Sequence, residues 1–266
     1  MNSQKLLAHY DNGQYWSQPI SATQGYNTNS AYRDALAVRD LRIARGEIPR
    51  GYKIGFTNRT IWTRYNVFGP IWGAVWNTTL TFCSGSQNLS LNAICQPRIE
   101  PEIVFGFKET PKSDATLEDI YKSLGWIAPG FEIVQSHMPD WKFEATDTIA
   151  DGGLHGRLIV GEKSSVSSIS KSANELHELL AEATATLYCD KHQIEVGVGT
   201  NVLDSPLNAL AHFLKELRSC PGSTDIKPGD VVTTGTWTDA YSVKSGESWS
   251  ISFSLPQASL TVHFED

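Results

Sequence analysis

Apolar positions recur at a helical spacing near the start of the chain and again near residue 210. Between residues 31 and 45 they form an approximate stripe, Asn29-Ser30 can cap the helix, and Gly46 ends it. Residues 206–217 carry leucines and alanines at the spacing of an amphipathic helix. Residues 1–28 are polar, with Trp16 as a large anchor, so we expect an arm or a loosely helical start there.

Beyond residue 50 the pattern changes to short runs of β-branched and aromatic residues, which predict strands. We expect strands at 52–56, 71–82, 99–107, 127–135, 158–160, 181–188, 194–198, 231–234, 249–253 and 260–264. Two of these regions read as hairpins, 71–82 and 181–198, and short helices are expected at 57–65 and 116–125. The pattern therefore predicts an α+β fold with a helical N-terminal segment, 1–50, and one β-rich unit, 51–266.

Composition excludes several classes of function. The chain has 266 residues, 40% of them hydrophobic, so a packed core is expected. Its net charge is −7 and its basic residues are scattered, which argues against nucleic acid or an anionic membrane as a partner. No secretory signal and no apolar run of about 18 residues is visible, and the four cysteines form no Cys-x-x-Cys pair. We expect a cytoplasmic protein with reduced thiols.

The strand at 99–107 carries two carboxylates where a buried strand should be apolar. Because side chains alternate between faces, Glu100 and Glu102 share one face, with Cα atoms roughly 6.6 Å apart. They can bend toward one point and hold a cation, whereas without one they would repel each other. The alternative is a solvated edge strand with both side chains facing water.

A third carboxylate, Glu132, lies on the strand predicted next along the chain. If the two strands are neighbours, three carboxylates converge. Three hard oxygen donors suit Mg²⁺ or Mn²⁺ better than Zn²⁺, which prefers His and Cys. A lone glutamate at a sheet edge is the alternative.

Two lysines stand among apolar residues. Lys53, between Tyr52 and Ile54, could bind a carboxylate or carry a proton if it is buried beside a metal, and Lys142, between Trp141 and Phe143, poses the same choice. Each could instead be a surface lysine.

Two glycine-containing segments offer polar groups to a ligand. Residues 151–156 read Asp-Gly-Gly-Leu-His-Gly, in which Asp151 could hold a water or a substrate oxygen and His155 could titrate near neutral pH. The strand at 231–234 opens into Gly235 and Thr236, which could bind a carboxylate. The alternatives are an ordinary Asp-Gly turn for the first segment and an ordinary strand end for the second. Trp72 could line a pocket for a bulky substrate tail, although most tryptophans belong to a core or an interface.

Together these motifs resemble the 2-keto-4-pentenoate hydratase and 4-oxalocrotonate decarboxylase family of the fumarylacetoacetase superfamily. The resemblance runs in family order through five segments: 52–57 (Tyr-Lys-Ile-Gly-Phe-Thr), 97–103 (Pro-Arg-Ile-Glu-Pro-Glu-Ile), 129–134 (Pro-Gly-Phe-Glu-Ile-Val), 142–143 (Lys-Phe) with 147–151 (Asp-Thr-Ile-Ala-Asp), and 229–236 (Gly-Asp-Val-Val-Thr-Thr-Gly-Thr). It implies a mixed β-sandwich roll with a helical N-terminal segment, a divalent cation, a homo-oligomer and a small 2-oxo acid as substrate.

The resemblance also implies roles for individual residues. By matching position it implies metal ligands at Glu100, Glu102 and Glu132, catalytic groups at Lys53 and Asp151, and substrate-carboxylate binding at Gly235 and Thr236. The implied activity is hydration of a 2-hydroxy-2,4-dienoate in aromatic catabolism. The alternatives are a 4-oxalocrotonate-type decarboxylase, an acylpyruvate hydrolase with His155 as base, and a metal-stabilised binding protein, which would not require Lys53.

Two segments depart from the family pattern. Residues 68–73 read Phe-Gly-Pro-Ile-Trp-Gly instead of a Pro-Asp-Phe-Gly type of loop, and the Ile-Trp-Gly looks more like the decarboxylase branch. The loop at 151–156 lacks the family's Asn and Ser side chains, and His155 is the candidate replacement.

Overall fold

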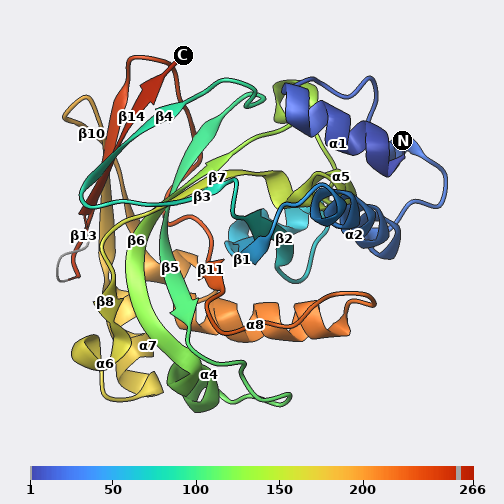
Figure 1. Cartoon of the computed structure of the whole chain (residues 1–266). Coiled ribbons are helices and arrows are strands. Elements are labelled where there is room, and N and C mark those ends of the chain that lie inside the picture. The colour runs from blue at the N-terminus through green and yellow to red at the C-terminus, as the bar shows by residue number, and fades with distance from the viewer. Residues whose placement is uncertain (1, 256–258) are drawn as a thin grey trace.

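Two β-sheets form the body of the protein in the computed structural model, which describes residues 2–255 and 259–266. The larger sheet has the strand order β2-β1-β11-β5-β6-β7-β3, with β12 beside β5 and β8 beside β6. The smaller sheet has the order β10-β9-β13-β14-β4. Figure 1 shows the long strands β5 and β6 curving side by side through the centre of the molecule.

The strands of the larger sheet are β1 (Pro49–Gly55), β2 (Ile71–Trp76), β3 (Leu80–Phe82), β5 (Arg98–Phe107), β6 (Leu124–Val134), β7 (His155–Val160), β8 (Ser164–Ser165), β11 (Val231–Thr233) and β12 (Tyr241–Ser242). Those of the smaller sheet are β4 (Ser86–Ser90), β9 (Thr184–Cys189), β10 (His192–Val198), β13 (Ser248–Phe253) and β14 (Ser259–Glu265).

The α-helices are α1 (Ser3–Asn12), α2 (Thr28–Ala44), α3 (Trp62–Tyr65), α4 (Leu117–Ser123), α5 (Ala145–Ala150), α6 (Val166–Ile169), α7 (Ala173–Glu182) and α8 (Pro206–Ser219). Short 3₁₀ turns are η1 (Ile20–Ala22), η2 (Arg59–Ile61), η3 (Pro139–Trp141), η4 (Gly152–Leu154) and η5 (Gly199–Asn201). None of the helices in the described ranges is long and apolar enough to cross a bilayer.

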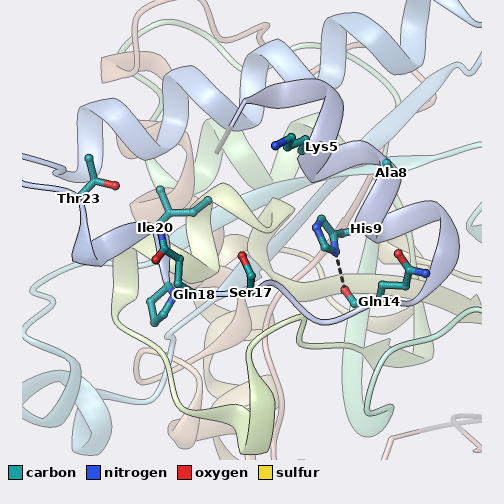
Figure 2. A pocket seen from close by; sticks show the side chains of 9 residues that line it. Lys5, Ala8, His9, Gln14, Ser17, Gln18, Ile20 and Thr23 are labelled. Carbon is teal, nitrogen blue, oxygen red and sulfur yellow. Dashed lines mark hydrogen bonds between the residues drawn. The ribbon is translucent and has the colours of Figure 1, made fainter.

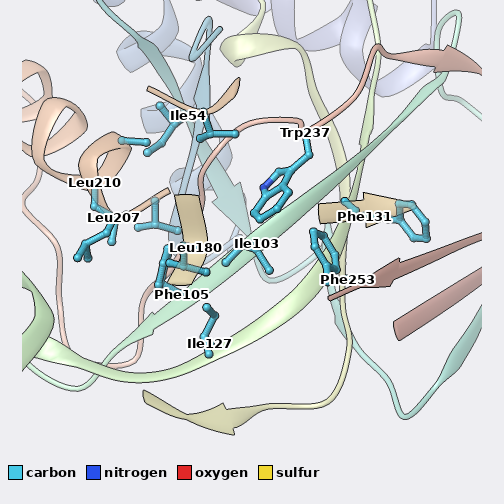
Figure 3. Close-up of a cluster of buried hydrophobic side chains, with 14 of the residues drawn as sticks. Ile54, Ile103, Phe105, Ile127, Phe131, Leu180, Leu207, Leu210, Trp237 and Phe253 are labelled. Atoms are coloured by element: carbon cyan, nitrogen blue, oxygen red, sulfur yellow. The ribbon is translucent and has the colours of Figure 1, made fainter. Parts of the chain in front are cut away.

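The main core lies on one face of the large sheet. Ile103 and Phe105 of β5 point into it together with Leu210 of α8, and Trp237 and Phe253 complete it from the C-terminal third of the chain. Figure 3 shows these side chains converging. Burying large apolar side chains such as these stabilises the fold by about 1.5–3 kcal/mol each.

The opposite face of the same strands carries the polar residues. Val104 of β5 and Ala128 of β6 form a small apolar cluster there with Leu158 of β7. Period-two alternation places Glu102 of β5 on the face of Val104, and Glu102 is fully buried. This face of the sheet therefore holds Glu102 buried beside a small apolar cluster.

The N-terminal helices pack against the rest of the chain. Leu6 of α1 and Ala31 of α2 belong to one apolar cluster with Ile71 of β2 and Ile149 of α5. The first 50 residues thus share a core with the β-rich part, and their separation as a domain stays a prediction.

The expected α+β architecture, with a rolled mixed sheet and helices at the N-terminus, is confirmed. The hairpin predicted at 71–82 is wrong, because β2 pairs with β1 whereas β3 pairs in parallel with β7. The hairpin around 190 is confirmed, with Asp190 and Lys191 both at positive φ in its turn. Helix α1, helix α7 and strand β4 were not expected as such, since their segments are rich in polar residues.

Candidate metal centre

Pairing of two antiparallel strands assembles the carboxylate cluster. Strand β5 lies against β6 with Glu100 directly opposite Glu132, and Glu102 follows two residues along on the same face. One carboxylate oxygen from each of the three residues lies within 4.8 Å of the other two. The solvated-edge alternative is excluded, since Glu102 and Glu132 are fully buried and their strands are central.

Glu102 is fixed from the neighbouring strand end. The Thr233 hydroxyl and the backbone N–H of Gly235, 2.6 Å away, both donate to its Oε2 atom. Gly235 has φ of +102°, and a Cβ there would lie 2.0 Å from the Thr57 hydroxyl oxygen. Only glycine fits this position, and its backbone N–H orients a carboxylate of the cluster, while its role in binding substrate stays a prediction.

Glu132 is held from two sides. The ammonium of Lys53 lies 3.1 Å from its Oε2, and Nδ1 of His155 lies 2.8 Å from its Oε1. The second ring nitrogen of His155 lies 2.8 Å from the hydroxyl of Thr79. Both nitrogens are engaged, so His155 supports Glu132 from behind.

The ionisation of the cluster follows from burial and mutual repulsion. Burial raises the pKa of Glu100 to about 7, and burial together with the other two carboxylates raises that of Glu102 well above its ordinary value. Although burial alone would raise the pKa of Glu132, the Lys53 charge and the His155 ring hold it below its ordinary value. Burial alone would lower the pKa of Lys53, but the surrounding carboxylates raise it. Lys53 is thus an ammonium, while burial keeps His155 neutral by lowering its pKa.

The cluster fits a divalent cation. Among the described residues, Oε1 of Glu102 is buried without a hydrogen-bond partner, and Oε2 of Glu132 is buried with the Lys53 ammonium 3.1 Å away. Such oxygens are costly unless a cation or water pairs with them. Three carboxylates against one ammonium leave negative charge that a divalent ion would balance, and an all-oxygen donor set suits Mg²⁺, Mn²⁺ or Ca²⁺.

A cavity of about 240 Å³ leads to the cluster. Lys53 and Glu100 lie in its wall with Thr236, whereas aromatic side chains, among them Trp141 and Phe143, line another part. A small organic acid fits such a space.

The structure brings some sequence-predicted residues to this cavity and directs others elsewhere. Lys53, Glu100, Gly235 and Thr236 line it, whereas Trp72, Asp151 and His155 line a second, narrower cavity behind the loop of Gly152 and Gly153. Lys142 lies outside both, with its side chain 81% exposed and paired with Asp140. The expectation that Lys142 contacts substrate is therefore corrected, because a lysine beside two aromatic residues still points to solvent.

Asp151 has a structural partner that the sequence did not reveal. Its carboxylate accepts from the ring of His137 at 2.6 Å and from the His137 backbone N–H at 3.2 Å. Trp16 stacks on that ring from the N-terminal segment. The pair anchors the start of the glycine loop, and no short sequence motif links residues so far apart.

Other wall residues were also missed. Arg98 precedes Glu100 by two positions and stacks on Trp141, with 4.2 Å from its guanidinium carbon to the ring centroid. Period-two alternation could have placed Arg98 on the face of the glutamates, whereas Trp141 comes from a distant turn. A further polar groove, beside α1, is lined by Lys5, His9 and Gln14 and by none of the three glutamates (Figure 2).

Comparison with known proteins gives a consistent group of relatives. No family model matches the chain. It is 28% identical over 219 residues to 2-hydroxyhexa-2,4-dienoate hydratase of Comamonas testosteroni, covering 82% of this chain and 79% of the relative. It is 27% identical over 221 residues to 2-keto-4-pentenoate hydratase of Paraburkholderia phymatum, with 82% and 79% covered. It is 26% identical over 220 residues to 4-oxalocrotonate decarboxylase of a Pseudomonas species, with 81% and 80% covered.

Solved structures show the same fold. A 4-oxalocrotonate decarboxylase from Pseudomonas putida G7, complexed with magnesium and adipate, matches with a TM-score of 0.87 and 21% identity, covering 98% of this chain and 95% of that one. Fumarylpyruvate hydrolase from Pseudomonas aeruginosa, in complex with Mn²⁺ and pyruvate, matches with a TM-score of 0.61 and 14% identity, covering 82% and 90%. The chain is thus similar in sequence to 2-keto-4-pentenoate hydratases and to a 4-oxalocrotonate decarboxylase, and it has the fold of a 4-oxalocrotonate decarboxylase and a fumarylpyruvate hydrolase.

Proposed function

We propose that the protein is a divalent-metal-dependent lyase that adds water to a 2-hydroxy-2,4-dienoate, with Mg²⁺ or Mn²⁺ as the metal. The observation that carries the proposal is the cluster of three glutamates, two of them fully buried, with Lys53 beside it and with Glu100 in the wall of a cavity that fits a small acid. Relatives named as hydratases of such substrates support it.

The residues of the site would have three different roles. Glu100, Glu102 and Glu132 would hold the cation, which when bound supplies Lewis acidity toward the oxygens of a 2-oxo acid. Thr233 and His155 fix the directions of the carboxylates. Lys53 presents a protonated Nζ to the cavity and would deliver and recover the proton that moves along the substrate chain.

A decarboxylase is the second candidate, and one observation favours it. Hydration needs a group that directs water at the far part of the substrate, yet the two residues expected for that role, Asp151 and His155, line the other cavity. Loss of CO₂ from a 2-oxo acid needs no attacking water. An acylpyruvate hydrolase has less support, because both ring nitrogens of His155, its expected base, are already engaged.

One assay separates the candidates. The protein is supplied in Mg²⁺ buffer with 2-hydroxypenta-2,4-dienoate and, separately, with 4-oxalocrotonate, while ultraviolet absorbance and released CO₂ are followed. Loss of dienoate absorbance without CO₂ supports the hydratase, and CO₂ release from 4-oxalocrotonate supports the decarboxylase. If neither substrate reacts with Mg²⁺ or Mn²⁺, the proposed function is wrong.

We further propose that the protein is a homo-oligomer in the cytoplasm. Light scattering tests the oligomeric state, and cell fractionation tests the location.

A further inference from the structure

Four aromatic rings form a continuous part of the wall of the cavity beside the glutamates. Phe56 directly follows β1, Tyr65 ends α3, Trp141 ends η3, and Phe143 lies two residues later. The Tyr65 ring lies between those of Phe56 and Phe143, with centroids 5.1 Å and 5.5 Å away, and the Phe143 ring lies 6.1 Å from that of Trp141. All four residues are half-buried, so each keeps part of its surface accessible.

The sheet places this aromatic wall to one side of the glutamates. Arg98 precedes Glu100 by two residues, roughly 6.6 Å along β5, and its guanidinium carbon lies 4.2 Å from the centroid of the Trp141 ring. Strand β1 contributes Lys53 to the cluster and leads into Phe56. Strand β11 is parallel to β1 and antiparallel to β5, so the end of β1 and the start of β5 lie at the same side of the sheet. Both strands thus lead from the cluster to the rings.

The cavity therefore has a charged part and an aromatic part. Aliphatic side chains join the rings in its wall, namely Ile61, Ile71 and Leu154. Besides Lys53 and Glu100, two of the described wall residues are charged, Arg98 and Asp239. Glu100 attracts the Arg98 guanidinium, which covers part of Trp141, and Asp239 is exposed. Aromatic rings bind planar apolar groups through offset-stacked or edge-to-face contacts.

The cavity has enough room for such a group. An apolar cavity of about 150 Å³ is sufficient to bind benzene. The cavity beside the glutamates measures about 240 Å³, so it accommodates one six-membered ring together with the short chain of a 2-oxo acid.

We propose that the aromatic wall binds an aryl group at the far end of the substrate, so that the protein prefers 2-oxo acids with an aryl tail over those with an alkyl tail. This inference rests on the proposed function, in which the 2-oxo acid end lies at the glutamates. It makes Phe143, whose ring lies between those of Tyr65 and Trp141, a specificity-determining residue.

A binding experiment tests the inference without turnover. Calorimetric titration of the Mg²⁺-loaded protein compares 2-oxohexanoate with 2-oxo-5-phenylpentanoate and 2-oxo-5-cyclohexylpentanoate, which replace its terminal methyl group by a planar and by a saturated six-membered ring. We expect the phenyl acid to bind at least about 10-fold more tightly than 2-oxohexanoate. It should also bind about 3- to 10-fold more tightly than the cyclohexyl acid, because only a planar ring can stack on the wall.

Two variants test the contribution of the rings. Phe143→Leu keeps an apolar side chain but removes a ring, so it should abolish the preference for phenyl over cyclohexyl, and Phe56→Leu should reduce it. Phe82→Leu is the matched control. Phe82 also lies edge-on to a tryptophan, Trp126, with centroids 6.0 Å apart, but it is 46% exposed and does not line the cavity. This variant should retain the full preference.

Two results would overturn the inference. The first is a wild-type protein that binds the cyclohexyl acid, or 2-oxohexanoate, as tightly as the phenyl acid, a comparison that needs no variant. The second is an unchanged preference for the phenyl acid in Phe143→Leu when its melting curve shows that it is folded.

Turnover separates this inference from the proposed function. The substrates are 2-hydroxyhexa-2,4-dienoate and its analogue with a phenyl group in place of the methyl group, 2-hydroxy-5-phenylpenta-2,4-dienoate. We expect a lower KM for the phenyl compound, and a rise of that KM in Phe143→Leu. Turnover of both compounds with equal KM values leaves the lyase standing and rejects the aryl site. Ring-dependent binding of the phenyl acid without turnover of either compound rejects the lyase and keeps the aryl site.

Discussion

Lys53 is a charged side chain that the fold fully surrounds. Tyr52 and Ile54, its neighbours on the strand, are buried in the main core, so alternation turns Lys53 to the opposite face. There its Nζ lies 3.1 Å from Oε2 of Glu132. The surface-lysine alternative is thereby excluded.

Replacing Lys53 by Met tests its role as proton carrier. We expect turnover to fall by at least about 100-fold, because the proton donor is lost, while Mg²⁺ affinity changes by less than about tenfold. Steady-state kinetics and calorimetry with Mg²⁺ measure the two effects. Because breaking a buried ion pair lowers the free energy of unfolding by about 3–5 kcal/mol, a melting curve must also show that the variant is folded. Unchanged turnover would favour a non-catalytic, metal-stabilised binding protein.

A second residue-scale prediction concerns His155. His155→Leu removes the hydrogen bond that orients Glu132, so Mg²⁺ should bind about 10- to 100-fold more weakly. Thr79→Ser, which keeps the hydroxyl beside the ring, is the control and should bind Mg²⁺ as the wild type does. If His155 were instead a general base, its loss would lower kcat with Mg²⁺ affinity intact.

At the scale of elements, the site depends on how β5, β6 and the end of β11 meet. The register that places Glu100 opposite Glu132 also places Ile103 and Phe131 on the core side, so packing and site geometry specify the same alignment. A one-residue slip of β5 would turn Glu100 and Glu102 into the hydrophobic core.

Gly235→Ala tests the connection after β11. An added Cβ meets Thr57 and displaces the N–H that binds Glu102, so we expect a lower Tm and weaker Mg²⁺ binding. Gly246→Ala is the control, because φ there is +88° but nothing lies within 4 Å of the added carbon. It should cost only the backbone strain, about 1–2 kcal/mol, and leave Mg²⁺ affinity unchanged. Equal effects of the two variants on Mg²⁺ affinity would contradict this account.

At the scale of the whole molecule, the cluster of three glutamates makes the free energy of unfolding depend on pH and on the bound metal. In the metal-free protein the pKa values of Glu100, about 7, and Glu102 lie above the ordinary 4.5, so the folded state holds these protons more tightly than the unfolded chain. The contribution of Glu100 to stability is complete below pH 4.5 and is lost as pH rises through about 7, and the raised pKa of Glu102 acts in the same direction. Metal binding has the opposite dependence, because it requires both groups to be ionised.

The increase in Tm on adding Mg²⁺ should therefore grow between about pH 5 and pH 8. At 100 times the dissociation constant, the metal adds about 2.7 kcal/mol to the free energy of unfolding. Melting curves with Mg²⁺ and with EDTA at several pH values measure the effect. Glu102→Gln should abolish the Mg²⁺-dependent increase, and an increase that shrinks with rising pH would show that the cation binds elsewhere.

Local sequence patterns predicted much of the fold and part of the candidate metal site. Alternation over 99–107 predicted the strand and the shared face of Glu100 and Glu102, since these follow from backbone geometry alone. The absence of a β2–β3 hairpin could not be foreseen, because pairing partners are chosen by the whole sheet. The polar segment of α1 gave no strong periodicity, and its helix is stabilised by packing Leu6 against residues far along the chain.

The sequence by itself determined which chemical groups were available: three carboxylates, a lysine among apolar residues, and a strand that could display two acids on one face. Only the tertiary structure decided that Lys53 pairs with Glu132. It also decided that His155 binds Glu132 and lies outside the cavity beside the glutamates, and that Arg98, and not Lys142, lines that cavity. The physical reason is that alternation sets the face of a side chain within one strand, whereas its distance to other strands depends on sheet order and curvature.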